Sequence, residues 1–345
     1  MIYLDANATT PLDPTVLEAM LPTLQHQHGN PSSGHQAGRI TRAAIDSARD
    51  SLASLLRCRP NELIFTSSGT ESDNLAILGT ARASKSKHLV TCVTEHHAVL
   101  HAFDHLEKHE GFSVTRLPVG ADGRLDPASL EAALRTDTAL VSLMTANNET
   151  GVLHPIAEIS TLCRKHGVPF HSDAVQSFGK EPLETTPFDL LSLAAHKFHG
   201  PMGGGLLFVR GGLPLTPLHL GGAQEGQRRS GTENTPAIVG LASAATLATA
   251  RLAEDSPRLA QLRDRLENGL LERCPGLVVN GAPQHRLPNT TNVTFPSSDS
   301  ESLLMALDLE GVCASSGSAC MVGSLQPSHV LMAMGISPAR ANRSL

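Results

Sequence analysis

Short apolar runs alternate with amphipathic stretches through the first two-thirds of the chain. Seven of these runs predict β-strands: Glu62–Thr66, His88–Val93, Phe112–Leu117, Ala139–Met144, Val168–His171, Leu190–Ala194 and Leu206–Arg210. Between several of them, apolar residues at helical spacing predict helices over Ser72–Arg82, Ala98–Glu110, Pro127–Arg135 and Ile156–His166. This alternation predicts an α/β fold with a mainly parallel seven-stranded sheet, which binds ligands at the carboxyl ends of its strands.

The pattern changes after about residue 232. Two long helical patterns, over 235–253 and 256–273, precede strands at Leu277–Asn280 and Thr291–Phe295 and a short helix at Ser300–Leu309. We therefore expect a large domain over residues 12–232 and a smaller α+β domain over residues 233–345. Residues 1–11 are expected to associate with the smaller domain or with the active site.

Composition narrows the class of protein. The chain has 345 residues and a net charge of −6, so no basic field favours nucleic acid. No apolar run reaches the roughly 18 residues that a membrane span needs, and the N-terminus lacks the pattern of a secretion signal. Six scattered cysteines without a Cys-x-x-Cys pair fit a reduced cytoplasm better than a disulfide framework or a zinc site.

One candidate site lies where a strand runs through a glycine-containing turn into a helix, over Phe65–Asn74. Free backbone N–H groups at Gly69 and Thr70, together with the Thr70 hydroxyl, favour a phosphate group. The alternative is an ordinary helix cap, which is the commoner role of Ser, Thr and Gly before a helix.

Further candidates follow other strands. Asp173 ends an apolar run, where a buried carboxylate needs a partner. It is either a helix cap or the partner of a pyridine nitrogen, with Gln176 three residues further on. Lys197 follows Leu190–Ala194 and is either a surface charge or the amine that forms a Schiff base with an aldehyde cofactor. His196 and His96 also follow strands, where an imidazole can serve as acid or base.

A glycine- and serine-rich stretch near the C-terminus, Ser315–Cys320, carries a possible sulfur nucleophile. The attacking species of Cys320 must be the thiolate, which requires a group that lowers its pKa or accepts its proton, such as His96. Small residues around Cys320 permit motion between a substrate and an external acceptor.

Taken together, these segments resemble a known family, the cysteine desulfurases of the NifS/IscS type. They are pyridoxal phosphate enzymes of the class V aminotransferase group. The matching segments occur in order and span essentially the whole chain: Tyr3–Pro11, Gly29–Ser33, Thr66–Asn74, Thr94–His96, Asn147–Gly151, Asp173–Gln176, His196–Lys197, Arg229–Thr232 and Ser315–Cys320.

The resemblance implies fold type I of the pyridoxal phosphate-dependent enzymes and a role for each matching residue. Lys197 carries pyridoxal 5'-phosphate, His96 stacks on its ring and Asp173 pairs with its nitrogen. Asn148 and Gln176 bind the oxygen side of the ring. Gly69, Thr70 and His196 hold the phosphate, which Thr232 reaches from the neighbouring subunit of a homodimer. Cys320 is the nucleophile that receives sulfur from L-cysteine.

The implied activity is desulfuration of cysteine to alanine, with the sulfur passed to an acceptor such as an iron–sulfur scaffold protein. Two alternatives stay open: a selenocysteine lyase or other class V enzyme, and a cofactor-binding form with little activity. The second follows from the C-terminus. The family's arginine for the substrate carboxylate would follow Leu345, so we expect either a truncated sequence or weak cysteine binding.

Overall fold

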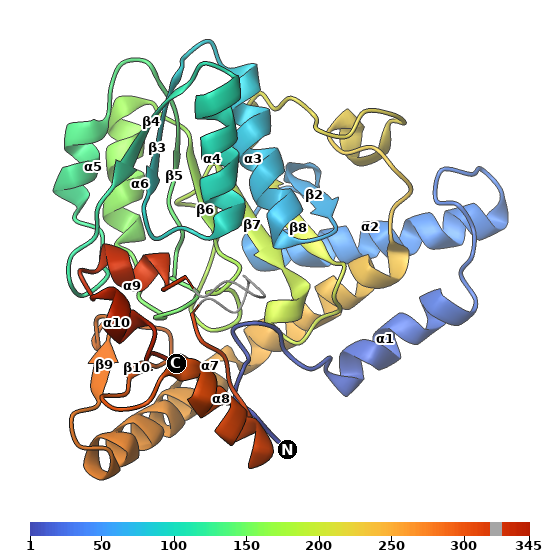
Figure 1. Ribbon diagram of the computed structural model, residues 1–345. Helices are drawn as coiled ribbons and strands as arrows, with labels where there is room; N and C mark the ends of the chain where they lie inside the picture. The colour runs from blue at the N-terminus through green and yellow to red at the C-terminus, as the bar shows by residue number, and fades with distance from the viewer. Residues whose placement is uncertain (318–325) are drawn as a thin grey trace.

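A seven-stranded sheet forms the centre of the computed structural model, which describes residues 1–317 and 326–345 (Figure 1). Its strand order is β2-β8-β7-β6-β5-β3-β4. The seven strands are β2 (Leu63–Thr66), β3 (His88–Cys92), β4 (Ser113–Leu117), β5 (Thr138–Ser142), β6 (Phe170–Asp173), β7 (Leu190–Ala194) and β8 (Gly205–Val209). All seven predicted strands are confirmed, with ends shifted by a few residues.

Strand direction follows the prediction of a mainly parallel sheet. Neighbouring pairs from β4 to β7 are parallel, whereas β8 runs antiparallel to both β7 and β2. Six strands are buried at every residue, since helices cover both faces of the sheet, and only β4 is partly exposed. The register pairs Asp173 with Ser192 and Ala194 with Gly205, which brings the candidate residues after β6 and β7 to one edge.

Successive residues of a strand pack into two separate hydrophobic cores, one on each face of the sheet, because side chains alternate between the two faces. Leu63, Val141 and Leu206 pack with α1, α2, α5, α6 and α7 on one face. Ile64 and Leu140 pack with α3 and α4 on the other. The predicted helices are confirmed as α3 (Gly69–Ala83), α4 (His97–His109), α5 (Pro127–Ala133) and α6 (Ile156–His166).

The helices α1 (Pro14–Gln25) and α2 (Gln36–Leu56) were not predicted. The signal for α2 is nonetheless present in the sequence. Ile45, Ala48, Leu52 and Leu56 recur at helical spacing and are all buried. The helix begins after His35, whose ring accepts the Gly38 amide, and ends at a left-handed Arg57.

The two predicted helices after residue 234 form a single one, α7 (Thr235–Arg273), with Pro257 inside it. Proline removes one backbone hydrogen bond, but packing of α7 against α1 and α2 keeps the helix continuous. By length and composition alone this helix is apolar enough to cross a membrane, a property that the core helix of a protein without a membrane span can also have. Small and apolar residues raise its hydropathy, and Ile238, Leu241 and Ala245 are buried in the first core.

Short elements complete the fold beside the far end of α7 (Figure 1). β9 (Val278–Asn280) pairs with β10 (Asn292–Thr294), and β1 (Ile2–Tyr3) pairs with β11 (Val312–Cys313). The remaining helices are α8 (Ser300–Leu309), α9 (His329–Ala333) and α10 (Pro338–Ala341). The predicted strands at 277–280 and 291–295 and the helix at 300–309 are thereby confirmed. Division into domains at residue 232 stays a prediction.

Replacement of Leu52 by Ala should lower the free energy of unfolding by about 2–5 kcal/mol, because a fully buried side chain would leave a cavity. Ser54→Ala, an exposed position on the same helix, should change it by less than about 0.5 kcal/mol. Urea denaturation followed by circular dichroism measures both. Equal effects of the two substitutions would show that α2 does not anchor the first core.

Candidate active site

The candidate site lies where β6 and β7 end beside each other. Asp173 is the last residue of β6, and Lys197 lies in the short 3₁₀ turn Ala195–Lys197 directly after β7. Burial raises the pKa of the Asp173 carboxyl to about 6, while the Val175 amide and the charge of Lys197 act in the opposite direction. The Lys197 amine and the buried Asp173 carboxyl therefore lie close enough to interact electrostatically, and their roles toward a cofactor stay predictions.

Residues 7–9 of the N-terminal segment cross this site. Lys197 Nζ donates to the carbonyl oxygens of Asn7 at 2.5 Å and of Ala8 at 2.9 Å. Gln176 Nε2 donates to the same Asn7 oxygen at 3.0 Å, and His196 Nδ1 lies 3.1 Å from Thr9 Oγ1. The structure thus brings Lys197, Gln176 and His196 together through one short segment.

Asn7 is a site residue that the sequence analysis missed. Its Nδ2 donates to the Asn148 carbonyl oxygen at 3.2 Å and to Thr290 Oγ1 at 3.1 Å, while its Oδ1 accepts from Asn289 Nδ2 at 3.1 Å. Asn148 therefore joins the cluster through its backbone, and the role predicted for its side chain stays a prediction. The available signal was the position of Asn7 within the matching segment Tyr3–Pro11.

The start of α3 fits an anion. Ser68 caps the helix by accepting the Glu71 amide, and within the described part of the chain the amides of Gly69 and Thr70 donate to no protein acceptor. A Cβ on Gly69 would lie 2.8 Å from Val175 Cγ2, so this turn packs tightly against the end of β6. Free amides at the end of a 15-residue helix are what a phosphate group requires.

His96 caps the next helix, α4, because its Nδ1 accepts the Ala98 amide at 3.1 Å. Burial, followed by the charge of Lys197, lowers the pKa of His96 to about 4. Burial and Lys197 likewise lower the pKa of His196 to about 4. Both imidazoles are therefore neutral at pH 7, and Nε2 of His96 carries the ring proton because Nδ1 accepts the Ala98 amide.

Two further acids, Asp73 and Glu95, lie buried beside Asp173 and were not singled out from the sequence. Burial raises the pKa of each well above its usual range, and the neighbouring Asp173 adds to both shifts. Asp73 Oδ1 lies 3.6 Å from His171 Nε2, and Glu95 Oε1 accepts the Met144 amide at 2.8 Å. Burial therefore favours the neutral forms of Asp73 and Glu95, whereas the charge of Lys197 favours the ionised form of Asp173.

A buried histidine and a second lysine extend this polar region. His171 lies between Ser142 Oγ at 2.8 Å and Ser192 Oγ at 3.0 Å, and burial lowers its pKa to about 3. Lys180 Nζ donates to Gln176 Oε1 at 3.3 Å, and burial followed by the charge of Lys197 lowers its pKa to about 7. Neither residue was predicted, since nothing in its local sequence marks a long-range contact.

Cys320, the predicted nucleophile, lies outside the described residues. The residues that flank its segment are held at the site. Glu149 accepts a hydrogen bond from Ser328 Oγ, and a Cβ on Gly317 would overlap the Glu149 carboxylate. Ser315 Oγ donates to Asp5 Oδ1 at 2.6 Å. Glu149 therefore contacts both chain segments that lead to the predicted nucleophile.

Thr232 lies apart from the other predicted residues and is exposed on this chain. The residues around it are fixed by ion pairs: Arg229 Nε lies 2.7 Å from Glu71 Oε1, and Arg42 Nη2 lies 2.6 Å from Glu233 Oε1. Its predicted contact with a neighbouring subunit stays a prediction.

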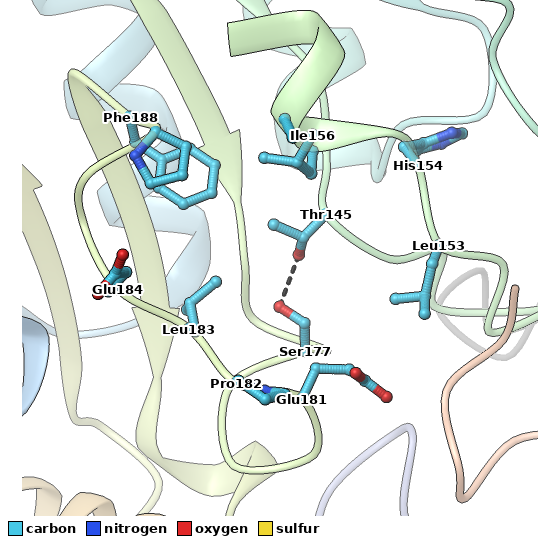
Figure 2. Close-up of a pocket in the computed structure, with 12 residues that line it drawn as sticks. Thr145, Leu153, His154, Ile156, Ser177, Glu181, Pro182, Leu183, Glu184 and Phe188 are labelled. Carbon is cyan, nitrogen blue, oxygen red and sulfur yellow. Dashed lines mark hydrogen bonds between the residues drawn. The ribbon is translucent and has the colours of Figure 1, made fainter.

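A cavity of about 290 Å³ lies behind the ends of β5 and β6 and contains none of the predicted site residues (Figure 2). Its wall includes the hydroxyls of Thr145 and Ser177, which lie 2.6 Å apart, and the side chains of Leu183 and Phe188. Thr145 also donates its amide to the Asp173 carbonyl oxygen.

Comparison with known proteins adds to this geometry. The aminotransferase class-V family profile matches residues 2–342. Cysteine desulfurase IscS of Methanosarcina thermophila is 49% identical over 339 residues, which are 97% of this chain and 83% of that protein. Cysteine desulfurase IscS of Anaeromyxobacter dehalogenans (strain 2CP-C) is 49% identical over 351 residues, which are 100% of this chain and 86% of that protein.

Solved structures of NifS-like and related proteins are also similar to this chain over nearly its whole length. A NifS-like protein superposes with a TM-score of 0.93 and 36% identity, covering 99% of this chain and 92% of that one. SspA in complex with cysteine superposes with a TM-score of 0.87 and 35% identity, covering 100% of this chain and 97% of that one.

The titration of Glu149 makes stability depend on pH. Burial raises its pKa from 4.5 to about 7, so between these values the folded protein binds more protons than the unfolded chain. Stability should therefore fall as pH rises through this window. Glu149→Gln should remove this part of the fall, which amounts to up to about 3 kcal/mol.

Urea denaturation of both proteins at several pH values between 4 and 8 measures the difference. Glu158→Gln, an exposed glutamate at the start of α6, is the matched control and should follow the wild type. Parallel curves for the wild type and Glu149→Gln would contradict the assignment of this titration to Glu149.

Proposed function

This chain belongs to the aminotransferase class-V family, and from that membership we propose that it is a cysteine desulfurase. The enzyme uses pyridoxal 5'-phosphate, converts L-cysteine to L-alanine and transfers the sulfur to an acceptor. One observation carries the proposal. Lys197 and the buried Asp173 share a site at the ends of β6 and β7, in a chain 49% identical to a cysteine desulfurase over 97% of its length.

The residues at this site fit the cofactor. Lys197 would hold its aldehyde carbon, Asp173 its pyridine nitrogen, and the amides of Gly69 and Thr70 its phosphate. His96 would lie against the ring, with His196 near the phosphate and Gln176 and Asn148 on the oxygen side. When bound, the cofactor supplies an electron sink for bond breaking at the substrate.

The ionisable side chains around the site suit the binding of the cofactor's pyridine ring. A protonated pyridine nitrogen needs an ionised carboxylate, and the charge of Lys197 favours that form of Asp173. Burial favours the neutral forms of Asp73 and Glu95, in which they add no second negative charge behind Asp173. His96 is neutral at pH 7, which suits stacking on the cofactor ring, and to take a proton from the substrate or from the thiol of Cys320 it would have to release the Ala98 amide from Nδ1.

The sulfur transfer balances without an external oxidant. The Cys320 thiolate attacks the substrate sulfur, an S–S bond forms and the bond between that sulfur and the substrate Cβ breaks. The electron pair of the broken bond stays with the substrate carbon, which takes up a proton and becomes the methyl group of alanine. The product on the enzyme is a persulfide on Cys320, from which an acceptor thiol then takes the sulfane sulfur.

The proposal also covers the protein that accepts the sulfur and the cellular compartment in which the enzyme works. The serine- and glycine-rich sequence around Cys320 suits delivery to a protein acceptor such as an iron–sulfur scaffold. The five cysteines in the described part of the chain are free thiols: Cys58, Cys92, Cys163, Cys274 and Cys313. Free thiols suit the reduced cytoplasm in which such a transfer would operate.

The activity is tested by measuring alanine and sulfide from L-cysteine with added pyridoxal phosphate and a thiol reductant. Wild-type protein should yield both products, Cys320→Ser should yield neither, and Lys197→Ala should also lose the visible absorbance of the bound cofactor. Cys313→Ser, a half-buried thiol on β11, is the matched control and should retain activity. Undiminished turnover by Cys320→Ser would point to an enzyme that needs no cysteine nucleophile, such as a selenocysteine lyase.

The homodimer is tested by mixing two inactive or weakened variants. If Thr232 reaches the cofactor of the other subunit, a dimer of one Lys197→Ala and one Thr232→Ala chain contains one site with both native residues. Thr232→Ala alone should bind the cofactor about tenfold more weakly, because one hydrogen bond to a charged phosphate is lost. Co-refolding the variants should restore a site of wild-type affinity, measured by titration with pyridoxal phosphate. If Thr232 acts within its own chain, mixing restores nothing.

A further inference from the structure

Four histidines follow one another at intervals of four residues along α4. They are His97, His101, His105 and His109. Residues four apart on a helix are neighbours on the same face, so the four rings form a row along α4. The row begins beside His96 at the active site and continues over the outer surface, where the last three rings are exposed. Neither the fold nor the proposed reaction requires this row.

The rings lie in two close pairs. The ring centres of His97 and His101 are 5.1 Å apart, as are those of His105 and His109. Two imidazoles that share a metal ion at a metal–nitrogen distance of about 2.1 Å have ring centres about 5 Å apart. Each pair therefore already has the spacing of a two-histidine metal site.

The surroundings distinguish the two pairs. His105 Nε2 lies 3.2 Å from Glu110 Oε1, so one of its nitrogens already has a carboxylate partner, which in turn pairs with Arg82 at 2.6 Å. At the first pair, His329 of α9 adds a third ring, 4.6 Å from His97. Its Nε2 donates to the Glu95 carbonyl oxygen at 3.0 Å, which leaves Nδ1 as an acceptor. Imidazole donors without a competing carboxylate thus gather at the start of α4.

We propose that His97 and His101 form a two-histidine clamp for a borderline divalent metal ion such as Zn²⁺ or Ni²⁺. Imidazole nitrogen suits these ions, and histidines at positions i and i+4 of a helix can ligate one metal together. Water completes the coordination. Among the described residues, no three or more His, Cys, Asp or Glu side chains are grouped to hold a metal ion, so two protein ligands define the site.

The position of the clamp gives it a link to the active site. His97 directly follows His96, whose ring caps α4, and His329 bonds to the backbone of Glu95. A metal ion bound to His97 and His101 therefore fixes the first turn of α4 next to the imidazole assigned to proton transfer. The metal site itself does not depend on the proposed desulfurase activity.

Calorimetric titration of the full chain with NiCl₂ at neutral pH tests the clamp. Cys320→Ser serves as the parent protein, so that the loop thiol cannot bind the metal. The parent should bind nickel. His101→Gln should weaken this binding at least about tenfold, since one of two ligands is lost. His105→Gln, an exposed histidine one turn further along the same face, should leave the affinity of that site within about twofold.

Three outcomes would overturn the proposal: a parent that binds no nickel, a His101→Gln variant that keeps the parent affinity, or equal losses in the two variants. Thermal melting followed by circular dichroism checks that both variants are folded. Because both positions are exposed, neither substitution should change the melting temperature measurably.

Discussion

The site depends on the electrostatic attraction between a lysine and a carboxylate that end neighbouring parallel strands. Burial alone would keep Asp173 protonated, and the charge of Lys197 together with the Val175 amide opposes this effect. Burial favours the neutral form of most other titratable groups nearby, including Asp73, Glu95, His96 and His171. Lys197 and Asp173 are therefore the main pair of opposite charges where β6 and β7 end, with Lys180 nearby at a pKa of about 7.

The N-terminal segment completes this site from outside the sheet. Asn7 binds Lys197 and Gln176 through its backbone and Asn148 and Thr290 through its side chain. It therefore connects the sheet, the loop after β5 and the strand pair β9–β10 in one hydrogen-bonded cluster. With β1 paired to β11, the first ten residues join parts of the chain that are distant in sequence.

The spacing of apolar residues along the sequence predicted those features of the fold and of the site that depend on neighbouring residues. Most of the seven strands are rich in apolar residues because both faces of the sheet are covered, and their run lengths identify them, whereas β4 is partly exposed. Asp173 and Lys197 could be placed because each directly follows such a run. The helix α2 shows the same kind of periodic signal and was overlooked, whereas α7 was divided because Pro257 resembles a boundary. Asn7, Asp73, Lys180 and Glu149 could not be found in this way, since each owes its role to residues far away in sequence.

The single antiparallel strand has a mechanical consequence. β7 and β8 are bonded along their whole length, and the connection between them, residues 195–204, carries Lys197. Both ends of that connection are anchored at the register pair Ala194 and Gly205, and a Cβ on Gly205 would lie 2.4 Å from Thr66 Oγ1 beside the phosphate turn. The lysine backbone and the start of α3 thus move as one body with the sheet. Any relative motion between the amine and its reaction partners has to come from the lysine side chain or from elements outside the sheet.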